Sequence, residues 1–327
     1  MNRIDDLPAR VLREPEIRAL VGPREALAAV RQAFAALADG AADLPAVLDF
    51  EFPEQRGEAH VKGAYLHGAP HWSVKAATGF YGNAAHGLPV TDGLSLVFSA
   101  TTGRLQTLLL DNGYLTELRT GSAGALAADL LAKPTIEQAT IVGAGGQARY
   151  QLEALLLVRR PRRVVVWSRT ADAARRYAAE MSERHDVEVA ADDDLARAVR
   201  GADLLVTTTP ARAPLIDAEW LRPGAHITAM GSDMAGKQEL DTAVLARADL
   251  VASDHPPAAA LHGELQHGVA DGAIRLDSVV ALGELVVGRA PGRRDDLSIT
   301  VADLVGLGIQ DAAVANAVQA AVATRPD

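Results

Sequence analysis

The chain has 327 residues, a length that suits two domains better than one. Hydrophobic residues make up 49% and charged residues 23%, which is typical of folded globular proteins. The formal net charge of −10 argues against a phosphate-driven nucleic-acid binder, because such proteins need a basic surface. The absence of cysteine excludes disulfide scaffolds, zinc–thiolate sites and cysteine nucleophiles.

The sequence contains no apolar run of the roughly 18 residues that a membrane span needs. The first residues, MNRIDDLPAR, lack the apolar region of a signal peptide. We therefore expect a cytoplasmic protein with no membrane partner.

The first third of the chain predicts one helix and an antiparallel sheet. Apolar residues at helical spacing over 26–38 end at Asp39-Gly40, which is a typical stop signal. Residues 41–112 then alternate short apolar runs, such as 95–99 and 105–110, with glycine-containing turns. A long alanine-rich helix is predicted over 120–132, before Pro134.

From residue 139 onward, predicted strands and helices alternate. Strands are predicted over 139–143, 163–167, 187–190, 204–208, 225–230, 250–253 and 298–301, and helices over 147–158, 172–184 and, last, 311–323. Nearly continuous apolar strands in such an alternation indicate a parallel sheet covered by helices on both faces.

A glycine-rich turn follows the first strand of this sheet. The run from Ile141 to Ala148 contains Gly143 and Gly145 in a G-x-G-x-x-A pattern and opens a helix. Gly143 allows the tight turn, and Gly145 allows the backbone to approach a pyrophosphate at the helix N-terminus. The pattern predicts dinucleotide binding, and the alternative is a plain glycine-rich turn.

The end of the second strand bears on which dinucleotide is bound. NAD sites usually place an acid there, whereas this strand ends in Ser168, Arg169 and Thr170. A guanidinium between two hydroxyls suits a 2′-phosphate, so the sequence favours NADP(H). NAD(H) remains the alternative, with Arg169 as a solvated surface charge.

Three charged residues stand out as candidates for chemistry. Lys75 lies among apolar residues of a predicted strand, so its ammonium either pairs with a distant acid or faces a ligand. Arg119 could grip a carboxylate through two hydrogen bonds, or merely pair with acids of the fold. Asp233 follows the fifth strand of the parallel sheet, where ligands bind, and could instead cap the next helix.

Other motifs give weaker signals. The pairs His67/His71 and His262/His267 lack a third clear ligand, so no metal site is expected. The basic run at 159–163 is typical of a helix end, and no G-x-S-x-G element supports hydrolase chemistry.

Taken together, the motifs resemble the ornithine cyclodeaminase/mu-crystallin family over nearly the whole chain. The residues that carry the resemblance are Lys75, Asn83-x-x-x-Gly87-Leu-Pro89, Leu118-Arg-Thr120, Val142-Gly-Ala-Gly-Gly-Gln147, Gly224-Ala-His-Ile-Thr-Ala-Met-Gly-Ser-Asp233, Gly236-Lys-Gln-Glu-Leu-Asp241 and Gly263-Glu-Leu265. The segments 56–65 and 110–116 most resemble the branch found with ectoine-utilisation enzymes. The segments 283–293 and 308–311 are similar to iminosuccinate reductases.

The resemblance implies a fold and a division of the chain. The expected fold is α/β, with a Rossmann-type doubly wound parallel sheet at 119–303. A mixed α+β domain for substrate binding and homodimerisation would comprise 1–118 with 304–327.

The resemblance also implies roles for individual residues. Lys75 and Arg119 would hold the substrate carboxylate, and Asp233 would be the catalytic acid/base. The residues expected to line the cofactor are Gly146, Gln147, Ser168, Thr209, Ala229, Met230 and Lys237, and Leu304 and Val305 would close the nicotinamide and substrate pocket.

One departure from the family pattern concerns the substrate. Members that process ornithine carry an arginine after the early proline, whereas this chain reads Leu44-Pro-Ala-Val47. An ornithine substrate is therefore in doubt. Lys62, on a strand of the same domain, is either the replacement cation or a surface lysine.

These features lead us to expect an enzyme of amino-acid metabolism. The expected activity is an NAD(P)H-dependent imine reductase acting on a small α-imino acid, or in reverse an amino-acid dehydrogenase. One alternative is a redox-neutral cyclodeaminase that releases ammonia. Another is a mu-crystallin-like protein that binds NADPH and a ligand.

Overall fold

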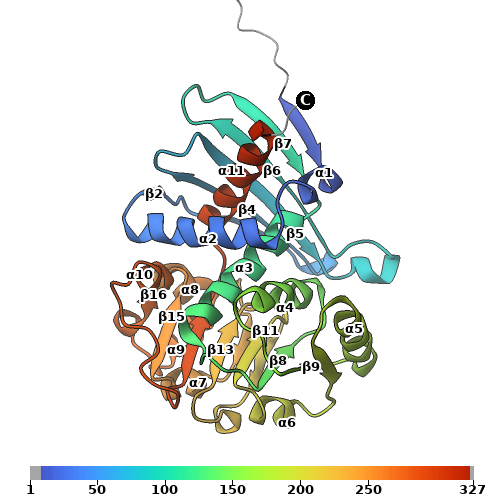
Figure 1. Cartoon of the computed structure of the whole chain (residues 1–327), viewed down its shortest axis with the longest axis vertical. Helices are drawn as coiled ribbons and strands as arrows, with labels where there is room; N and C mark the ends of the chain where they lie inside the picture. The colour runs from blue at the N-terminus through green and yellow to red at the C-terminus, as the bar shows by residue number, and fades with distance from the viewer. Residues whose placement is uncertain (1–8, 325–327) are drawn as a thin grey trace, which may run out of the picture. The chain divides into compact units, whose positions relative to one another are not determined.

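The computed structural model describes residues 9–324. The chain forms two compact units, Met1–Arg119 with Leu307–Asp327, and Thr120–Gly306. The chain passes from the first unit to the second inside α3 (Tyr114–Leu131) and returns to the first unit directly before α11 (Gly308–Thr324). Figure 1 colours both helices by residue number.

The first unit is built on a seven-stranded sheet. Its order is β1-β7-β6-β5-β4-β2, with β3 also paired to β4. All of these pairs are antiparallel except β1 with β7, which is parallel. The strands are β1 (Arg10–Arg13), β2 (Ala42–Asp43), β3 (Leu48–Phe52), β4 (Gly57–Leu66), β5 (His71–Phe80), β6 (Thr91–Ser99) and β7 (Leu105–Leu110). The antiparallel sheet predicted for 41–112 is therefore confirmed, and β1 is an addition that the sequence did not reveal.

Helices cover this sheet. Besides α1 (Glu14–Arg18), the first unit contains α2 (Pro23–Ala38), which packs against α11. In turn, α11 packs on β4 and β5, and Asn316 donates a hydrogen bond to the main-chain oxygen of His71 (3.1 Å). Val30 and Phe34 of α2 are fully buried, so these helices supply one side of the hydrophobic core.

The helix α3 begins six residues earlier than the sequence predicts. The Asp111 carboxylate accepts a hydrogen bond from the Leu115 main-chain N–H (2.7 Å), which satisfies one of the free donors of the first turn. Arg119 consequently lies within this helix rather than before it.

The second unit is a Rossmann-type sheet of eight strands. The order is β10-β9-β8-β11-β13-β17-β15-β16, and every pair is parallel. The strands are β8 (Gln138–Val142), β9 (Arg163–Trp167), β10 (Glu188–Ala191), β11 (Leu204–Thr207), β13 (His226–Ala229), β15 (Leu250–Ser253), β16 (Val280–Ala281) and β17 (Thr300–Asp303). A separate parallel pair joins β12 (Arg212–Ile216) to β14 (Gln238–Leu240).

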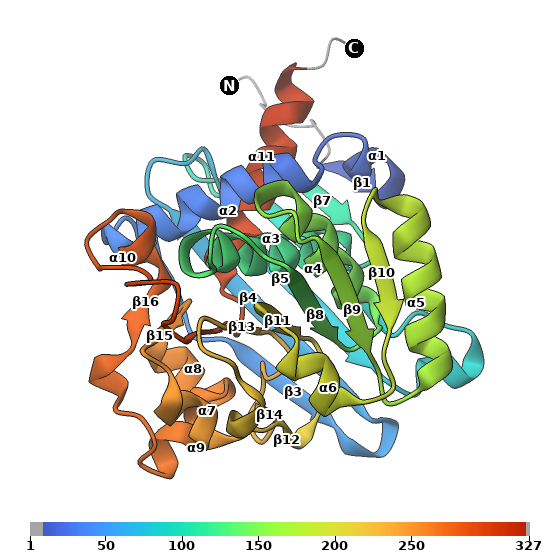
Figure 2. The same cartoon turned by 60° about the horizontal axis from the view of Figure 1, so that its bottom comes forward.

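Helices alternate with these strands, as predicted (Figure 2). They are α4 (Gly146–Val158), α5 (Ala171–Arg184), α6 (Leu195–Arg200), α7 (Thr242–Arg247), α8 (Pro256–His262), α9 (Leu265–Ala270) and α10 (Leu282–Val286). Short 3-10 turns occur at Pro53–Gln55, Asn83–His86, Ala218–Trp220 and Leu276–Ser278. The parallel topology confirms the predicted α/β class, and it brings the carboxyl ends of the strands to one edge of the sheet.

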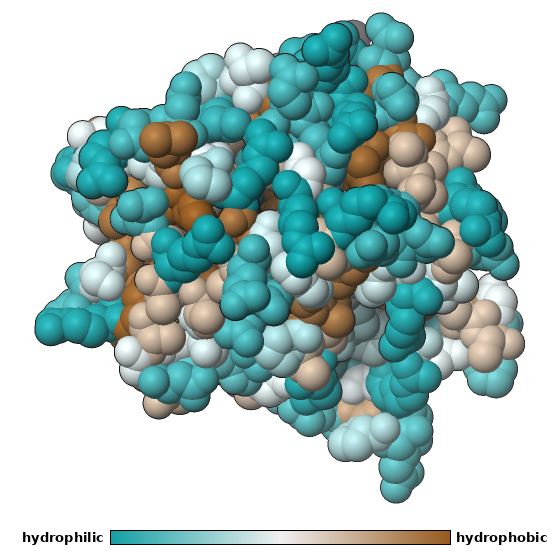
Figure 3. Space-filling model, turned by 90° about the horizontal axis from the view of Figure 1, so that it is seen from below, coloured by the Kyte–Doolittle hydropathy of each residue, from teal (hydrophilic) through white to brown (hydrophobic). Residues whose placement is uncertain are grey.

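The exposed residues and the helices have the character that the amino-acid composition predicts for a folded globular protein. Hydrophilic residues predominate on the face drawn in Figure 3, where hydrophobic residues are exposed only in scattered areas. None of the helices within residues 9–324 combines the length and the apolar character needed to cross a bilayer.

Candidate active site

Two lysines of the first unit stand side by side on its sheet. Lys62 of β4 and Lys75 of β5 are direct cross-strand partners, so their side chains share one face of the sheet. Both are buried, with exposed fractions of 9% and 3%. Burial of an ammonium group costs free energy unless the group is paired. The partners of these lysines therefore determine which ligands this face of the sheet can bind.

The partner of Lys75 comes from the C-terminal helix. Asp311, in the first turn of α11, lies with its Oδ1 atom 3.1 Å from the Lys75 Nζ atom. The same oxygen accepts a hydrogen bond from Nε of Arg119 (3.1 Å), and another Arg119 nitrogen donates to Gln310 Oε1 (2.8 Å). All four residues are at most 5% exposed.

The charges of this cluster perturb one another. Burial lowers the pKa of Lys75 to about 7, with Asp311 opposing the shift and Arg119 and Lys62 adding to it. Burial alone would raise the pKa of Asp311, but the nearby cations outweigh it and hold that pKa below its ordinary value. The pKa of Asp111 is raised to about 6, mainly by burial.

In this cluster two basic groups share one carboxylate oxygen. Lys75 and Arg119 both contact Oδ1 of Asp311. The Nε2 atom of Gln310 is buried and has no hydrogen-bond partner within the described residues. A carboxylate from a substrate would supply an acceptor for this nitrogen and a second negative charge for Lys75 and Arg119.

Sequence reasoning found three members of this cluster and missed Asp311. Lys62, Lys75 and Arg119 were candidates, and the structure brings them together in one unit. Asp311 was noted as the start of a helix and as part of the segment 308–311, but it was given no role. One sequence feature could have drawn attention to Asp311. It is the only charged residue in α11, whose other residues are nearly all small or apolar.

In the second unit, the glycine turn has the geometry expected of a phosphate site. Gly143 has φ +114°, and a side chain there would meet Thr208 Oγ1 at 2.5 Å. By contrast, nothing lies within 4 Å of a Cβ atom built on Gly145, which is the N-cap of α4 and has no side chain capping it. The free space and the uncapped N–H groups fit a bound pyrophosphate.

The other predicted cofactor residues lie along the same edge of the parallel sheet. Ser168 is half-buried after β9, and Arg169 and Thr170 beside it are exposed. Thr209 follows β11, Ala229 ends β13 and Met230 comes directly after it. Leu304 and Val305 follow β17. Gly146 and Gln147 open α4.

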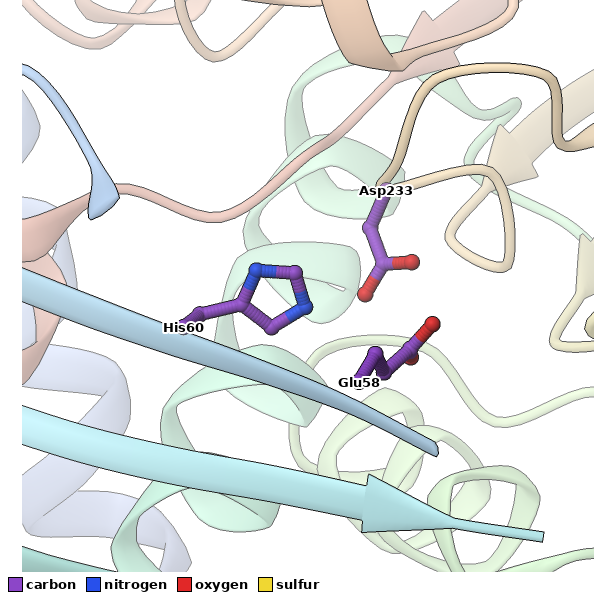
Figure 4. A group of neighbouring side chains, drawn as sticks. All are labelled: Glu58, His60 and Asp233. Atoms are coloured by element: carbon purple, nitrogen blue, oxygen red, sulfur yellow. The ribbon is translucent and has the colours of Figure 1, made fainter. Parts of the chain in front are cut away.

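Asp233 lies on the loop between β13 and β14 (Figure 4). Its Oδ1 atom is 2.7 Å from the Nζ atom of Lys237, which is buried. No helix follows Asp233 directly, since β14 comes next, and the residue that caps α7 is Asp241. The alternative interpretation of Asp233 as a helix cap is therefore wrong.

A buried acid braces the strand ends beside this loop. The Glu239 carboxylate accepts hydrogen bonds from Thr207 Oγ1 (2.6 Å), the Thr209 N–H (2.6 Å) and the Gly231 N–H (2.9 Å). Burial raises its pKa despite these bonds. Glu239 thereby ties the ends of β11 and β13 together, a role that no sequence pattern indicated.

Comparison with known proteins places these features in a family. The profile of the ornithine cyclodeaminase/mu-crystallin family matches residues 10–325. The chain belongs to this family. It is 43% identical over 309 residues to an uncharacterized cyclodeaminase of Sinorhizobium fredii, covering 94% of this chain and 93% of that protein. It is 37% identical over 310 residues to the alanine dehydrogenase of Archaeoglobus fulgidus, with the same two coverages.

A solved structure of the family has the same fold. The Δ1-pyrroline-2-carboxylate reductase of Thermococcus litoralis, in complex with NADH and L-proline, superposes with a TM-score of 0.92 at 27% identity. The match covers 96% of this chain and 97% of that one. The family resemblance inferred from the sequence is thus confirmed, as is the expectation of a nicotinamide-dependent oxidoreductase or cyclodeaminase.

Proposed function

We propose that this protein is an NAD(P)H-dependent imine reductase that acts on a small α-imino acid, or in reverse an amino-acid dehydrogenase. The observation that carries the proposal is that buried Lys75 and Arg119 share one oxygen of Asp311, beside a Gln310 amide nitrogen that has no acceptor among the described residues. An α-carboxylate is the anion that every such substrate provides, and Arg119 and Lys75 would hold it. The similarity to an alanine dehydrogenase and a pyrroline-carboxylate reductase supports this assignment.

The dinucleotide would be held by the second unit. Gly143, Gly145 and the N-terminus of α4 would bind its pyrophosphate, and Thr209, Met230, Leu304 and Val305 would contact the nicotinamide half. When bound, the cofactor supplies the two electrons of the reduction. Lys237 would keep Asp233 ionised through their 2.7 Å contact.

The protein's own contribution is orientation and charge. Arg119 and Lys75 would fix the substrate through its carboxylate, which restricts the approach of its C=N carbon. A C=N group accepts electrons readily only when its nitrogen is protonated. The Asp233 carboxylate would stabilise that cation.

The direct test combines a substrate screen with one variant. Oxidation of NADPH is followed with α-keto acids plus ammonia or methylamine, with cyclic imines such as Δ1-pyrroline-2-carboxylate, and with iminosuccinate formed in situ. On the best substrate, Arg119→Met should raise KM about 10- to 150-fold, the loss of roughly 1.5–3 kcal/mol from one charged hydrogen bond. An imine without a carboxylate should be affected far less, and equal losses on both would contradict the proposed role of Arg119.

A cyclodeaminase is the second candidate, favoured by the 43% identity to a cyclodeaminase of Sinorhizobium fredii. Stoichiometry separates the two activities. A reductase consumes one NAD(P)H per turnover, whereas a cyclodeaminase releases ammonia from a diamino acid with no net consumption.

We also infer that NADP(H) is the preferred cofactor. Arg169 is exposed after β9, and residues 168–170 include no acid that could accept a hydrogen bond from a ribose hydroxyl. We propose the cytoplasm as the compartment of this activity, because reduced nicotinamide cofactor is available there.

A homodimer is the assembly that we propose. The edge strand β3 exposes Leu48, Phe50 and Phe52, with exposed fractions of 58%, 50% and 39%. These residues alternate along β3 and so share one face, which a second copy of the chain would cover. Phe50→Glu should then shift the molar mass measured by light scattering from dimer to monomer.

A further inference from the structure

A histidine–aspartate pair stands on the same sheet face as Lys62 and Lys75. His60 of β4 is the direct cross-strand partner of Asp49 of β3, and its Nδ1 atom lies 2.6 Å from Asp49 Oδ1. The His60 side chain is 13% exposed and that of Asp49 is 30% exposed. Figure 4 shows His60 and Glu58 on β4, two residues apart and thus on one face.

The pair leaves one ring nitrogen of His60 unused. A carboxylate only accepts hydrogen bonds, so the short contact to Asp49 places a proton on Nδ1. In the neutral ring, Nε2 then carries a lone pair. This atom is buried and has no hydrogen-bond partner within residues 9–324. A buried, unpartnered nitrogen of this kind is costly in a purely structural role.

The register of the sheet brings His60 next to the anion-binding cluster. His60 precedes Lys62 by two residues, a step of about 6.5–7 Å along a strand. The residue opposite His60 on β5 is Ala77, and the residue opposite Ala77 on β6 is Gly93. Small side chains therefore flank His60 on this face of the sheet.

We propose that His60, oriented by Asp49, exchanges a proton with the nitrogen of the substrate whose carboxylate Lys75 and Arg119 hold. This inference rests on the proposed function. In the reductive direction the doubly protonated ring gives up its Nε2 proton, which bonds to the substrate nitrogen, and the ring returns to the neutral form with its proton on Nδ1. The C=N π pair becomes the nitrogen lone pair, and the hydride that reduces the carbon would come from the bound nicotinamide cofactor. In the reverse direction, neutral Nε2 takes a proton from the substrate ammonium.

The charged groups around His60 are arranged for such an exchange. Asp49 and Glu58 supply negative charge from β3 and β4, and Glu58 accepts a hydrogen bond from the Tyr81 hydroxyl (2.8 Å). Positive charge comes from Lys62 on the same strand and from Lys75 opposite it. Further residues that contribute charge to this face of the unit are Glu51, Asp111, Arg119 and Asp311.

The first test compares two histidines of the same unit. His60→Asn should lower kcat for Δ1-pyrroline-2-carboxylate reduction about 100-fold, within the range usual for acid–base residues, with KM changed only a few-fold. It should also remove one limb of the kcat–pH profile. The control is His67→Asn, because His67 forms the same kind of pair with Asp43 (3.1 Å) but is exposed. Wild-type kcat and pH profile in His60→Asn would overturn the proposal.

The second test does not depend on turnover. In protein labelled with ¹⁵N-histidine and saturated with NADPH, which cannot react with L-proline, the His60 resonances should report a proton on Nδ1 and none on Nε2. Addition of L-proline should shift the Nε2 signal toward the protonated form, and Asp49→Asn should abolish the tautomer preference. An Nε2 signal unchanged at saturating L-proline would overturn the proposal.

The two proposals fail in different ways. If no imine in the screen supports NADPH oxidation, the proposed function fails whatever His60 does. If wild type turns over and Arg119→Met shows the expected KM effect while His60→Asn matches wild type, only the role of His60 is wrong.

Discussion

The Nζ atom of Lys75 lies 3.1 Å from Oδ1 of Asp311, which joins a central strand of the first unit to the helix at the far end of the chain. Both side chains are nearly inaccessible to water. Asp311 also neutralises part of the charge of Arg119. The removal of Asp311 would leave two buried cations facing each other without a counter-charge.

Asp311→Leu should therefore lower the free energy of unfolding by about 3–5 kcal/mol, the usual cost of breaking a buried ion pair. Lys75→Met should cost less, because Asp311 keeps Arg119 as a partner. Urea denaturation of both variants and of the double variant measures this. The double variant should lose less free energy of unfolding than the two single variants lose together. Strictly additive losses would show that Lys75 and Asp311 do not stabilise each other.

The two glycines of the dinucleotide turn should respond differently to alanine. At Gly143 a methyl group meets Thr208, and the backbone has a positive φ, so Gly143→Ala should lower the free energy of unfolding by more than about 1 kcal/mol. Gly145→Ala should leave stability within about 0.5 kcal/mol, because its surroundings are open. The same change should weaken NADPH binding roughly tenfold, or about 1.4 kcal/mol. Unchanged affinity in Gly145→Ala would argue against a pyrophosphate at this turn.

Cofactor preference should be reversible at the end of β9. Wild type is expected to bind NADPH several-fold more tightly than NADH. The double change Ser168→Asp with Arg169→Ala adds a carboxylate that repels a 2′-phosphate and removes its partner, a swing of about 2–4 kcal/mol toward NADH. Dissociation constants for both cofactors on both proteins decide the matter. Equal affinities in wild type would mean that Arg169 is only a solvated charge.

Asp233→Asn should reduce kcat on the order of 100-fold or more, as expected for a group that stabilises or exchanges a proton. NADPH affinity should change only a few-fold, although the ion pair with Lys237 is lost. Lys237→Met serves as the matched variant, since it removes the same ion pair and keeps the carboxylate. If Asp233→Asn turns over normally, the carboxylate has no part in the reaction.

A pH effect on stability is expected from Asp303, at the end of β17. Burial, reinforced by Asp254 and Glu239, raises its pKa from 3.8 to about 7. The folded protein therefore retains a proton that the unfolded chain has already lost. The free energy of unfolding contributed by this group falls as pH rises from 3.8 to about 7 and then levels off.

Asp303→Asn removes this dependence and keeps an oxygen for the Leu265 N–H that Asp303 binds at 2.9 Å. The free energy of unfolding of the variant, relative to that of wild type, should rise by about 1–3 kcal/mol as the pH is raised from 4.5 to 8. Urea denaturation at both pH values measures the difference. If the difference in free energy of unfolding between variant and wild type is the same at both pH values, Asp303 is ionised in the folded protein at pH 4.5 as well as at pH 8.

Much of this architecture is encoded locally. The short apolar runs at 95–99 and 105–110, set between glycine-containing turns, identified the first sheet, and the nearly continuous apolar strands from 139 onward identified the second. The glycine turn could be recognised because its function depends on the backbone of a few consecutive residues. Lys75 stood out since an ammonium in an apolar strand needs a partner wherever it lies.

The identity of those partners was decided only by the tertiary structure. The contact of Lys75 with Asp311, the bond between His60 and Asp49, and the brace that Glu239 forms at Thr207 and Gly231 all join residues distant in sequence. Sequence periodicity reports burial, whereas pairing depends on strand register and on which helix packs over which strand. One residue of register would turn His60 away from Lys75 and dissolve the site.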